Sequence, residues 1–307
     1  MEFDLTLPIL SIRSHSELEE LMASIFQWEG SARRVGVKPK ALRSFTHRVA
    51  QQYHANPYHN LNHAVDTCNT MGWLITRPVF HKNLSDWERF LLLVSALVHD
   101  VDHPGHDNQW EIKTRSPLAR KFNNVSVLEN NSVEVTNAFL DDPQLNIFAA
   151  LGGKAEKDAR HKIAMLVLAT DFSRHQDFLD RLDAAILASR TRFNDRRFLE
   201  LITGSLIKAA DIANTTKPFH LARFWGARVM QEFWRQGERE KAQHLEVGPL
   251  NDPDSMDVNA AQAGFIKFAC MGLFELLCKI DGDIAEMLGN LHRNVHEYEQ
   301  RVAPNHK

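Results

Sequence analysis

Two histidines four residues apart, His59 and His63, are the first chemical signal in the sequence. On an α-helix such a pair lies on one face, about one turn apart, where both imidazoles can reach one metal ion. Pro57 suits the start of that helix, because the first helical position has no hydrogen bond for a proline to lose. We therefore expect one helix to carry both histidines. Taken alone, a pair at this spacing is more often two ordinary histidines than a metal site.

A second cluster of ionisable residues, His99, Asp100, Asp102 and His103, directly follows the apolar segment 87–98. Ionisable groups at the end of a core helix are costly unless they are paired or bound to metal. His99 and Asp100 are adjacent, so both can reach one ion where the helix ends. His103 can orient a bound water or a carboxylate. The competing interpretation is a solvated surface loop.

A lone aspartate, Asp211, ends the apolar segment 198–210. By itself it is more simply explained as an N-cap or as a core aspartate that accepts hydrogen bonds. With His63, His99 and Asp100 it completes a set of two imidazoles and two carboxylates, which suits zinc or another first-row metal. The set contains no thiolate, which favours a catalytic over a structural zinc site.

This ligand set predicts a two-metal hydrolase. Asp100 can bridge to a second, harder ion such as Mg²⁺, whose other positions are filled by water. Two ions about 3.5–4 Å apart can activate a bridging hydroxide and neutralise the oxygens of an in-line displacement at phosphorus.

The elements that would position these residues are helical in pattern almost throughout. Apolar residues recur at helical spacing in the segments 17–26, 87–98, 160–169 and 198–210. Alternating β-branched runs between Asn-Gly or Asp-Gly turns are missing. Two irregular segments, 114–124 and 247–259, are typical of lids or binding loops. We predict a single all-α domain over residues 1–307, with many helices and no substantial sheet.

Composition excludes several classes of protein. The 307 residues are 44% hydrophobic and 24% charged, as in soluble globular proteins, and a net charge of -3 gives no reason to expect nucleic acid or an acidic membrane as a partner. The longest apolar run is too short to span a bilayer, and the first residues lack a signal-peptide pattern. Three cysteines without a CxxC pair indicate reduced thiols. We expect this domain to be cytoplasmic, even if a longer parent protein is attached to a membrane.

The order of the motifs resembles the HD superfamily of metal phosphohydrolases, and within it the class I 3′,5′-cyclic nucleotide phosphodiesterases. The resemblance covers nearly the whole chain. It is carried by residues 58–64, 99–109, 126–130, 168–171, 210–218 and 261–266. It implies an all-α catalytic domain with its core at about residues 50–290, which hydrolyses the 3′ phosphoester bond of cAMP, cGMP or both to the 5′-nucleoside monophosphate.

The same resemblance implies roles for individual residues. The four predicted ligands bind Zn²⁺, and Asp100 also binds Mg²⁺ or Mn²⁺. The waters around that second ion are held by His103, Glu129 and Thr170. His59 is the general acid that protonates the leaving 3′ oxygen, a role that fits a side chain titrating near neutral pH.

The purine site is implied to contain Gln262, whose amide reads the base edge, and Phe265, which stacks on the base. Without the metal motifs these would be an ordinary helix-surface glutamine and a core phenylalanine. Further implied substrate contacts are Tyr58, Phe172, Asn214 and residues 247–259. Because Gln262 can present its amide either way round, the choice between cAMP and cGMP stays open.

The chain departs from the family pattern in three places. Asn131 and Ser132 replace two histidines expected near the phosphate, which can weaken phosphate contacts or shift the pH optimum. Trp110 ends the HD motif, and residues 212–216 read Ile-Ala-Asn-Thr-Thr instead of a Ser-Asn-Pro-Thr pattern. None of these changes removes a metal ligand.

Two other functions stay open. The first is an HD enzyme that acts on another nucleotide. Gln262 and Phe265 together with His59 argue against it, because such an enzyme does not need this combination. A catalytically weak cyclic-nucleotide sensor is disfavoured by the intact ligand set. The resemblance also leaves room for a homodimer and for a regulatory domain upstream in a longer protein.

Overall fold

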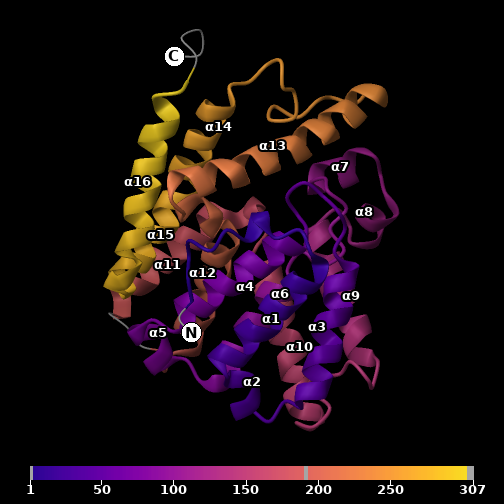
Figure 1. Cartoon of the computed structure of the whole chain (residues 1–307), viewed down its shortest axis with the longest axis vertical. Helices are drawn as coiled ribbons and strands as arrows, with labels where there is room; N and C mark the ends of the chain where they lie inside the picture. The colour runs from indigo at the N-terminus through magenta and orange to yellow at the C-terminus, as the bar shows by residue number, and fades with distance from the viewer. Residues whose placement is uncertain (1–2, 190–192, 303–307) are drawn as a thin grey trace.

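The structure, a computed structural model, describes residues 3–189 and 193–302 and folds them into sixteen α-helices (Figure 1). They are α1 (His15–Glu29), α2 (Ser31–Arg34), α3 (Pro39–Gln52), α4 (Leu61–Ile75), α5 (Pro78–Asn83), α6 (Asp86–Val98), α7 (Asn108–Lys113), α8 (Pro117–Lys121), α9 (Val127–Asp141), α10 (Gly153–Leu168), α11 (His175–Ser189), α12 (Arg196–Ile212), α13 (Phe219–Ala242), α14 (Val258–Phe265), α15 (Met271–Ile280) and α16 (Ala285–Glu299). Short 3₁₀ turns occur at Ile9–Ser11, Phe172–Arg174, Ala213–Thr216 and Gly282–Ile284, and a π-helical turn at Ile266–Cys270. No strand occurs in the two described ranges, and the prediction of an all-α domain is confirmed.

Helix α6 shows how the sequence specifies a core element. Ser85 and Glu88 form a capping box: the Ser85 hydroxyl accepts from the Glu88 N–H, and the Glu88 carboxylate accepts from the Ser85 N–H. Every residue from Arg89 to Val98 is buried, so the helix runs through the interior. It ends at His99, which places the HD motif at its inner end.

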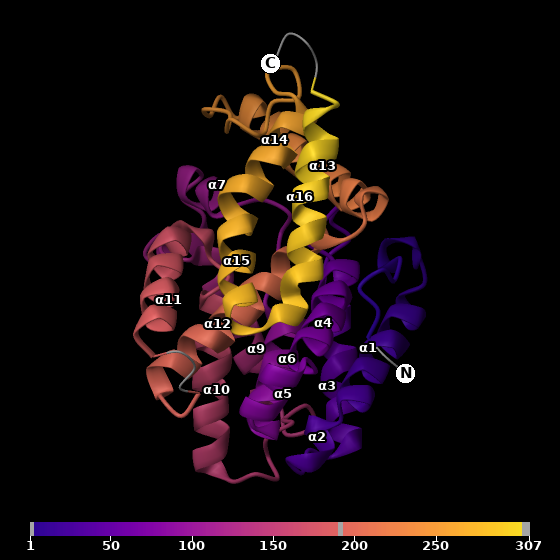
Figure 2. The ribbon, with the colours of Figure 1, turned by 90° about the vertical axis from the view of Figure 1, so that its left-hand side faces the viewer.

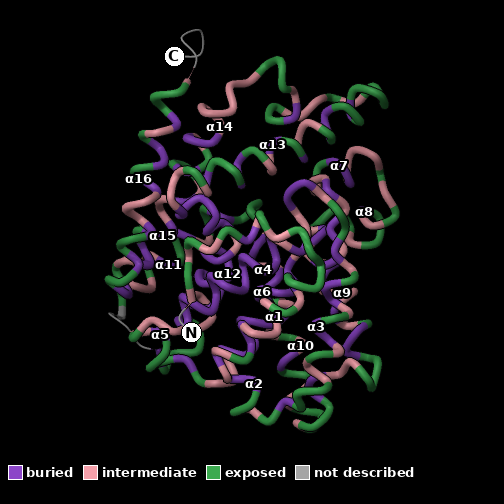
Figure 3. The backbone as a smooth tube through the Cα atoms, viewed as in Figure 1, coloured by how far each residue is buried: buried purple, intermediate pink, exposed green. Residues whose placement is uncertain are grey.

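Helices α4, α6 and α12 pack against one another at the centre of the molecule (Figures 1 and 2). Their residues are mostly buried, whereas the outer helices are exposed on one side (Figure 3). The buried apolar side chains form one contiguous core that extends from Ile9 to Tyr298. Polar motif residues at the ends of these three helices therefore lie close to one another.

The last four helices form a second layer of the molecule. The long helix α13 crosses above the central helices, and α14 and α15 pack on α16 beside it (Figures 1 and 2). Of these helices, α13 reaches the loop before α4, where Glu232 accepts from the Tyr58 and His59 N–H groups.

The predicted irregular segments are partly confirmed. Residues 247–257 have no helix and α14 begins at Val258, whereas the segment 114–124 contains the short helix α8. Pro117 at the start of α8 and the Ser116 side chain, which accepts from the Ala119 N–H, explain that short helix. No described helix has the length and apolar character needed to cross a membrane.

Candidate active site

The four predicted metal ligands converge at the inner ends of the central helices. His63 lies in the first turn of α4, His99 and Asp100 directly follow α6, and Asp211 lies in the last turn of α12. One donor atom from each lies within 4.8 Å of the others. His99 Nε2 is 3.0 Å from Asp100 Oδ2, and His63 Nε2 is 3.1 Å from Asp211 Oδ1.

The donor set fits a divalent metal ion. His99 Nδ1 donates to the Ala96 carbonyl oxygen at 3.0 Å, so in the neutral imidazole Nε2 carries the lone pair and faces the cluster. Among the protein groups alone, burial raises the pKa of Asp211, but the charge of protonated His99 and hydrogen bonds from His63 and His99 lower it below the usual range. A bound cation would act on Asp211 in the same direction. Two ionised carboxylates beside two imidazole nitrogens form a mixed site that suits zinc or a similar metal.

The prediction that His59 and His63 share one helix is wrong. Helix α4 begins at Leu61, and Asn60 is its N-cap, with extended backbone and a side chain that accepts from the His63 N–H at 3.2 Å. Asparagine competes for the backbone in this way and favours the cap over the helix interior. His59 therefore lies in the loop before α4, free of the helix geometry.

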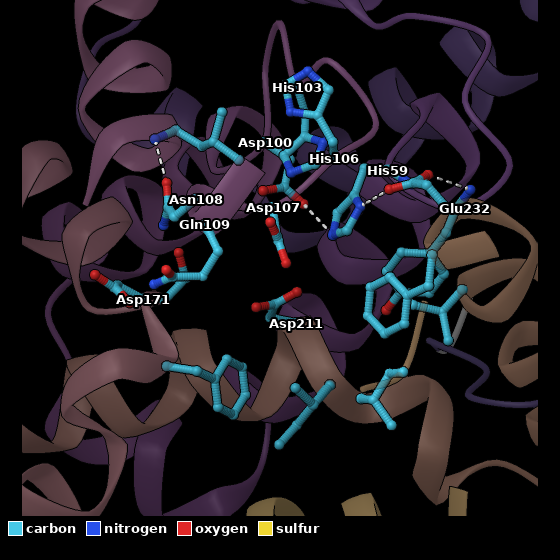
Figure 4. Close-up of a pocket in the computed structure, with 18 of the residues that line it drawn as sticks. His59, Asp100, His103, His106, Asp107, Asn108, Gln109, Asp171, Asp211 and Glu232 are labelled. Carbon is cyan, nitrogen blue, oxygen red and sulfur yellow. Dashed lines mark hydrogen bonds and ion pairs between the residues drawn. The ribbon is translucent and has the colours of Figure 1, made fainter. Parts of the chain in front are cut away.

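His59 is held by a residue that the sequence analysis missed, Glu232 of α13. The Glu232 carboxylate accepts a hydrogen bond from His59 Nδ1 and from the backbone N–H groups of Tyr58 and His59, at 3.0 and 3.1 Å. His59 Nε2 then lies 4.0 Å from Asp100 Oδ2, on the side of the metal cluster (Figure 4).

Charge governs the protonation of this pair. Burial lowers the pKa of His59, but the charge of Glu232, the charge of Asp100 and the hydrogen bond to Glu232 outweigh it and raise the pKa to about 9. Burial raises the pKa of Glu232, but the charge of His59 and its hydrogen bond outweigh that and lower the value to about 2. The pair is thus an imidazolium and a carboxylate at neutral pH.

A pattern in the sequence could have revealed Glu232. In α13 the polar residues Glu232, Gln236 and Glu240 follow one another at four-residue spacing, and all three are buried. A buried polar stripe on a helix needs partners. Gln236 has such a partner in Asp107, because Gln236 Nε2 donates to Asp107 Oδ1 at 2.9 Å.

The three residues predicted to hold waters line the same pocket as Asp100 and Asp211 of the cluster. The ring of His103 stacks on that of His59 with centroids 3.9 Å apart, and its Nδ1 accepts from the Gly105 N–H at 3.1 Å. Glu129 accepts from Asn108 Nδ2 at 3.0 Å, and burial raises its pKa to about 7. The Thr170 hydroxyl donates to the Val167 carbonyl at 2.7 Å.

The pocket has a volume of about 710 Å³, and all five predicted substrate contacts line it. They are Tyr58, Phe172, Asn214, Gln262 and Phe265. The Phe172 and Phe265 rings have centroids 6.0 Å apart, and Asn214 Nδ2 donates to the Tyr58 hydroxyl at 2.7 Å. Leu250 is the one described residue of the segment 247–259 that joins this lining.

Asn131 and Ser132, which replace the two histidines that the family pattern puts near the phosphate, are not among the residues that line the pocket. Asn131 Nδ2 donates to Asp102 Oδ2 at 3.2 Å, and the Ser132 hydroxyl donates to the Val101 carbonyl at 3.0 Å. Both side chains support the loop that follows α6. Asp102 has a φ of 66°, so this loop contains a left-handed residue that needs support.

Comparison with known proteins identifies relatives of this site. Residues 58–291 match the family model described as 3′5′-cyclic nucleotide phosphodiesterase. The high affinity cGMP-specific 3′,5′-cyclic phosphodiesterase 9A of Pan troglodytes is 30% identical over 286 residues, which are 93% of this chain and 48% of that protein. The probable 3′,5′-cyclic-AMP phosphodiesterase pde-4 of Caenorhabditis elegans is 32% identical over 273 residues, which are 87% of this chain and 40% of that protein. The chain spans about half, or less, of the length of these two relatives.

Solved structures resemble the chain over almost its full length. LmjPDEB1 in complex with IBMX superposes with a TM-score of 0.90 and 29% identity, covering 97% of this chain and 92% of that one. The phosphodiesterase domain of the RhoPDE fusion protein from the choanoflagellate Salpingoeca rosetta gives a TM-score of 0.91 at 27% identity, with 97% and 94% covered. Since the family model matches the region that holds all four clustered donors, the chain belongs to the 3′,5′-cyclic nucleotide phosphodiesterase family.

Proposed function

We propose that the chain hydrolyses the 3′ phosphoester bond of cAMP, cGMP or both to the 5′-nucleoside monophosphate. One observation carries the proposal: the two carboxylates of a four-donor cluster, Asp100 and Asp211, line one pocket together with a charged histidine, an amide and two aromatic rings. Such a pocket offers a place for a phosphate at one end and for a purine at the other.

The cluster of His63, His99, Asp100 and Asp211 would hold Zn²⁺, and Asp100 would also contact Mg²⁺ or Mn²⁺. The waters around that second ion would be held by His103, Glu129 and Thr170. When bound, the ions supply a water acidic enough to attack phosphorus at neutral pH and neutralise charge on the phosphate oxygens.

His59 would act as the general acid. Its Nδ1 hydrogen is engaged by Glu232, so the proton available for transfer is the one on Nε2, which faces the cluster. Transfer of that proton to the 3′ oxygen avoids the release of an alkoxide. Glu232 keeps the ring in place and stabilises its charged form, as a carboxylate does beside a catalytic histidine.

The purine would lie between the metal cluster and the outer helices. Phe265 and Phe172 would stack on it, and the Gln262 amide would hydrogen-bond its edge. Tyr58 and Asn214 would contact it from the α4 side. The names of the relatives include both a cGMP-specific and a probable cAMP enzyme, which supports testing both nucleotides.

The test is a parallel turnover assay of purified protein with Mg²⁺ and trace Zn²⁺, on cAMP and on cGMP, with the 5′-monophosphate measured as product. Formation of 5′-AMP or 5′-GMP that stops on addition of a chelator is the expected result. Tight binding of either nucleotide without product would contradict hydrolysis and favour a sensor. Turnover of other nucleotides alone would favour a general HD phosphohydrolase.

We also propose a cytoplasmic location for this domain and, independently of that location, a homodimer of the purified chain. Cys68 and Cys270 are buried free thiols, which supports a reducing compartment. Light scattering of the purified chain measures the oligomeric state directly.

A further inference from the structure

A glycine inside α13, Gly226, lies against the side chain of Gln262. A Cβ atom at Gly226 would be 2.9 Å from Gln262 Oε1, 3.0 Å from Gln262 Cδ and 3.1 Å from the Tyr298 hydroxyl oxygen. Carbon contacts this short are repulsive. The Gln262 amide thus occupies space that any other residue at position 226 would take.

Backbone conformation does not explain why position 226 is a glycine. The described glycines with positive φ are Gly30, Gly36, Gly105 and Gly152, so Gly226 has a conformation open to every residue. Glycine is among the least favourable residues in a helix interior. What position 226 requires is the space left by the missing side chain, beside a pocket that both Gly226 and Gln262 line.

The Gln262 amide is otherwise weakly constrained. The residue as a whole is 7% exposed, and its side-chain amide has no hydrogen bond to another residue among those that the structure describes. The amide donor and acceptor of Gln262 therefore remain available to a ligand. On the side of α13, Gly226 determines how closely the amide can approach the helix. A methyl group at 226 would meet the flexible end of the Gln262 side chain at 2.9 Å and, less closely, the Tyr298 hydroxyl at 3.1 Å, so the Gln262 amide is the group that would move.

We infer that Gly226 is a positioning residue for Gln262 and thereby determines purine specificity. The space at 226 sets the distance of the Gln262 amide from the purine edge, and with it the relative rates on cAMP and cGMP. This inference rests on the proposed hydrolysis of cyclic nucleotides.

The test compares wild type, Gly226→Ala and Gly289→Ala by kcat and KM on cAMP and on cGMP. Gly289 is a matched control in α16, because its Cβ would meet only the Arg293 guanidinium, at 3.5 Å or more. For Gly226→Ala we expect KM to rise about 10-fold on at least one nucleotide, the effect of losing one to two hydrogen bonds, and the cAMP/cGMP ratio of kcat/KM to change. We expect kcat within about 3-fold of wild type, because neither residue belongs to the metal cluster, and a melting temperature no lower than that of wild type.

A double-mutant cycle separates action through Gln262 from a direct effect on the pocket. In a Gln262→Ala background the Gly226→Ala change should have little further effect on KM. An unchanged KM and nucleotide ratio in Gly226→Ala, or an undiminished effect in the Gln262→Ala background, would overturn the inference. If Gly226→Ala does not fold, Gln262→Asn withdraws the amide by one methylene, and an unchanged KM for that variant would equally overturn it.

The wild-type measurement distinguishes the two proposals. No wild-type turnover of either nucleotide contradicts the proposed function. In that case the same variants are compared by their calorimetric dissociation constants for cAMP and cGMP, and equal constants for wild type and Gly226→Ala contradict the role of Gly226.

Discussion

The two ends of the pocket are built in different ways. At the proposed metal end, His63 and His99 are 1% exposed, and neighbouring donor atoms lie 3.0–3.4 Å apart. At the proposed purine end, Phe172 and Phe265 are 38% and 40% exposed, and the Gln262 side-chain amide makes no hydrogen bond to another described residue. The buried charged side chains are fixed by contacts with one another, whereas the side chains proposed to bind the purine are positioned by packing alone.

This contrast has a functional consequence. Groups that act on the reacting phosphate must be held to within a fraction of an ångström, and burial among charged partners achieves this. Groups that bind a flat purine need only offer a surface and a few hydrogen bonds. Substitutions at the metal end should therefore reduce kcat, and substitutions at the purine end should raise KM.

The largest effect is expected for Asp211→Ala. Removal of this ligand should lower kcat/KM at least about 1,000-fold, because an ion contributes several kcal/mol of transition-state stabilisation. Steady-state kinetics with Mg²⁺ and Zn²⁺ measures the loss. Asp158→Ala, at an exposed position of α10, is the matched control and should keep wild-type kinetics. Activity retained in Asp211→Ala would remove this residue from the metal site.

The next largest effect is expected for Glu232→Gln. We expect kcat to fall about 100-fold, because His59 loses the carboxylate that orients it and stabilises its charge. Glu238→Gln, at an exposed position of the same helix, should leave kcat unchanged. Wild-type kcat for Glu232→Gln would show that His59 does not depend on this partner.

The pH profile of Glu232→Gln shows in which direction the pKa of His59 changes when the carboxylate is removed. A general acid works while it is protonated, so activity falls as pH rises through the pKa of His59, which the protein raises to about 9. Without the charge of Glu232, burial dominates and the pKa falls, so the alkaline limb of kcat should move to lower pH. Bound cations lower the pKa of His59 in wild type and in Glu232→Gln alike, so the measurement is the difference between the two pH profiles. A limb that stays in place would contradict the assignment of His59 as the acid.

A smaller effect is expected for Phe265→Ala. Loss of the ring should raise KM about 10-fold with little change in kcat, as for loss of one aromatic stacking contact on a base. The matched control is Phe268→Ala, one turn further on and 84% exposed, which should keep the wild-type KM. Equal KM values for the two variants would place the purine elsewhere in the pocket.

The smallest effect is expected for Asn131→Ala. The change removes a hydrogen bond to Asp102 and should lower stability by about 1 kcal/mol, seen as a lower melting temperature. The values of kcat and KM should stay within about 3-fold of wild type, because Asn131 does not line the pocket. A KM increase above 10-fold would show that this position does act on the phosphate end.

The helical class and the residues of the clustered donor group were predictable from the sequence. Apolar spacing indicated α6 and α12, and the polar residues that end them had few roles in a buried setting except pairing or metal binding. These signals are local, since each motif lies within a few residues of the helix that positions it.

The partnerships between motifs were decided by the tertiary structure. His59 and Glu232 are 173 residues apart, and their hydrogen bond exists only because α13 crosses above the start of α4. The same holds for Asn131 against Asp102 and for Gly226 against Gln262. The sequence by itself determined which residues could do chemistry, because residue type and local spacing set their donors, charges and helices. Which of these residues meet depends on how distant helices pack, and that packing is a property of the whole chain.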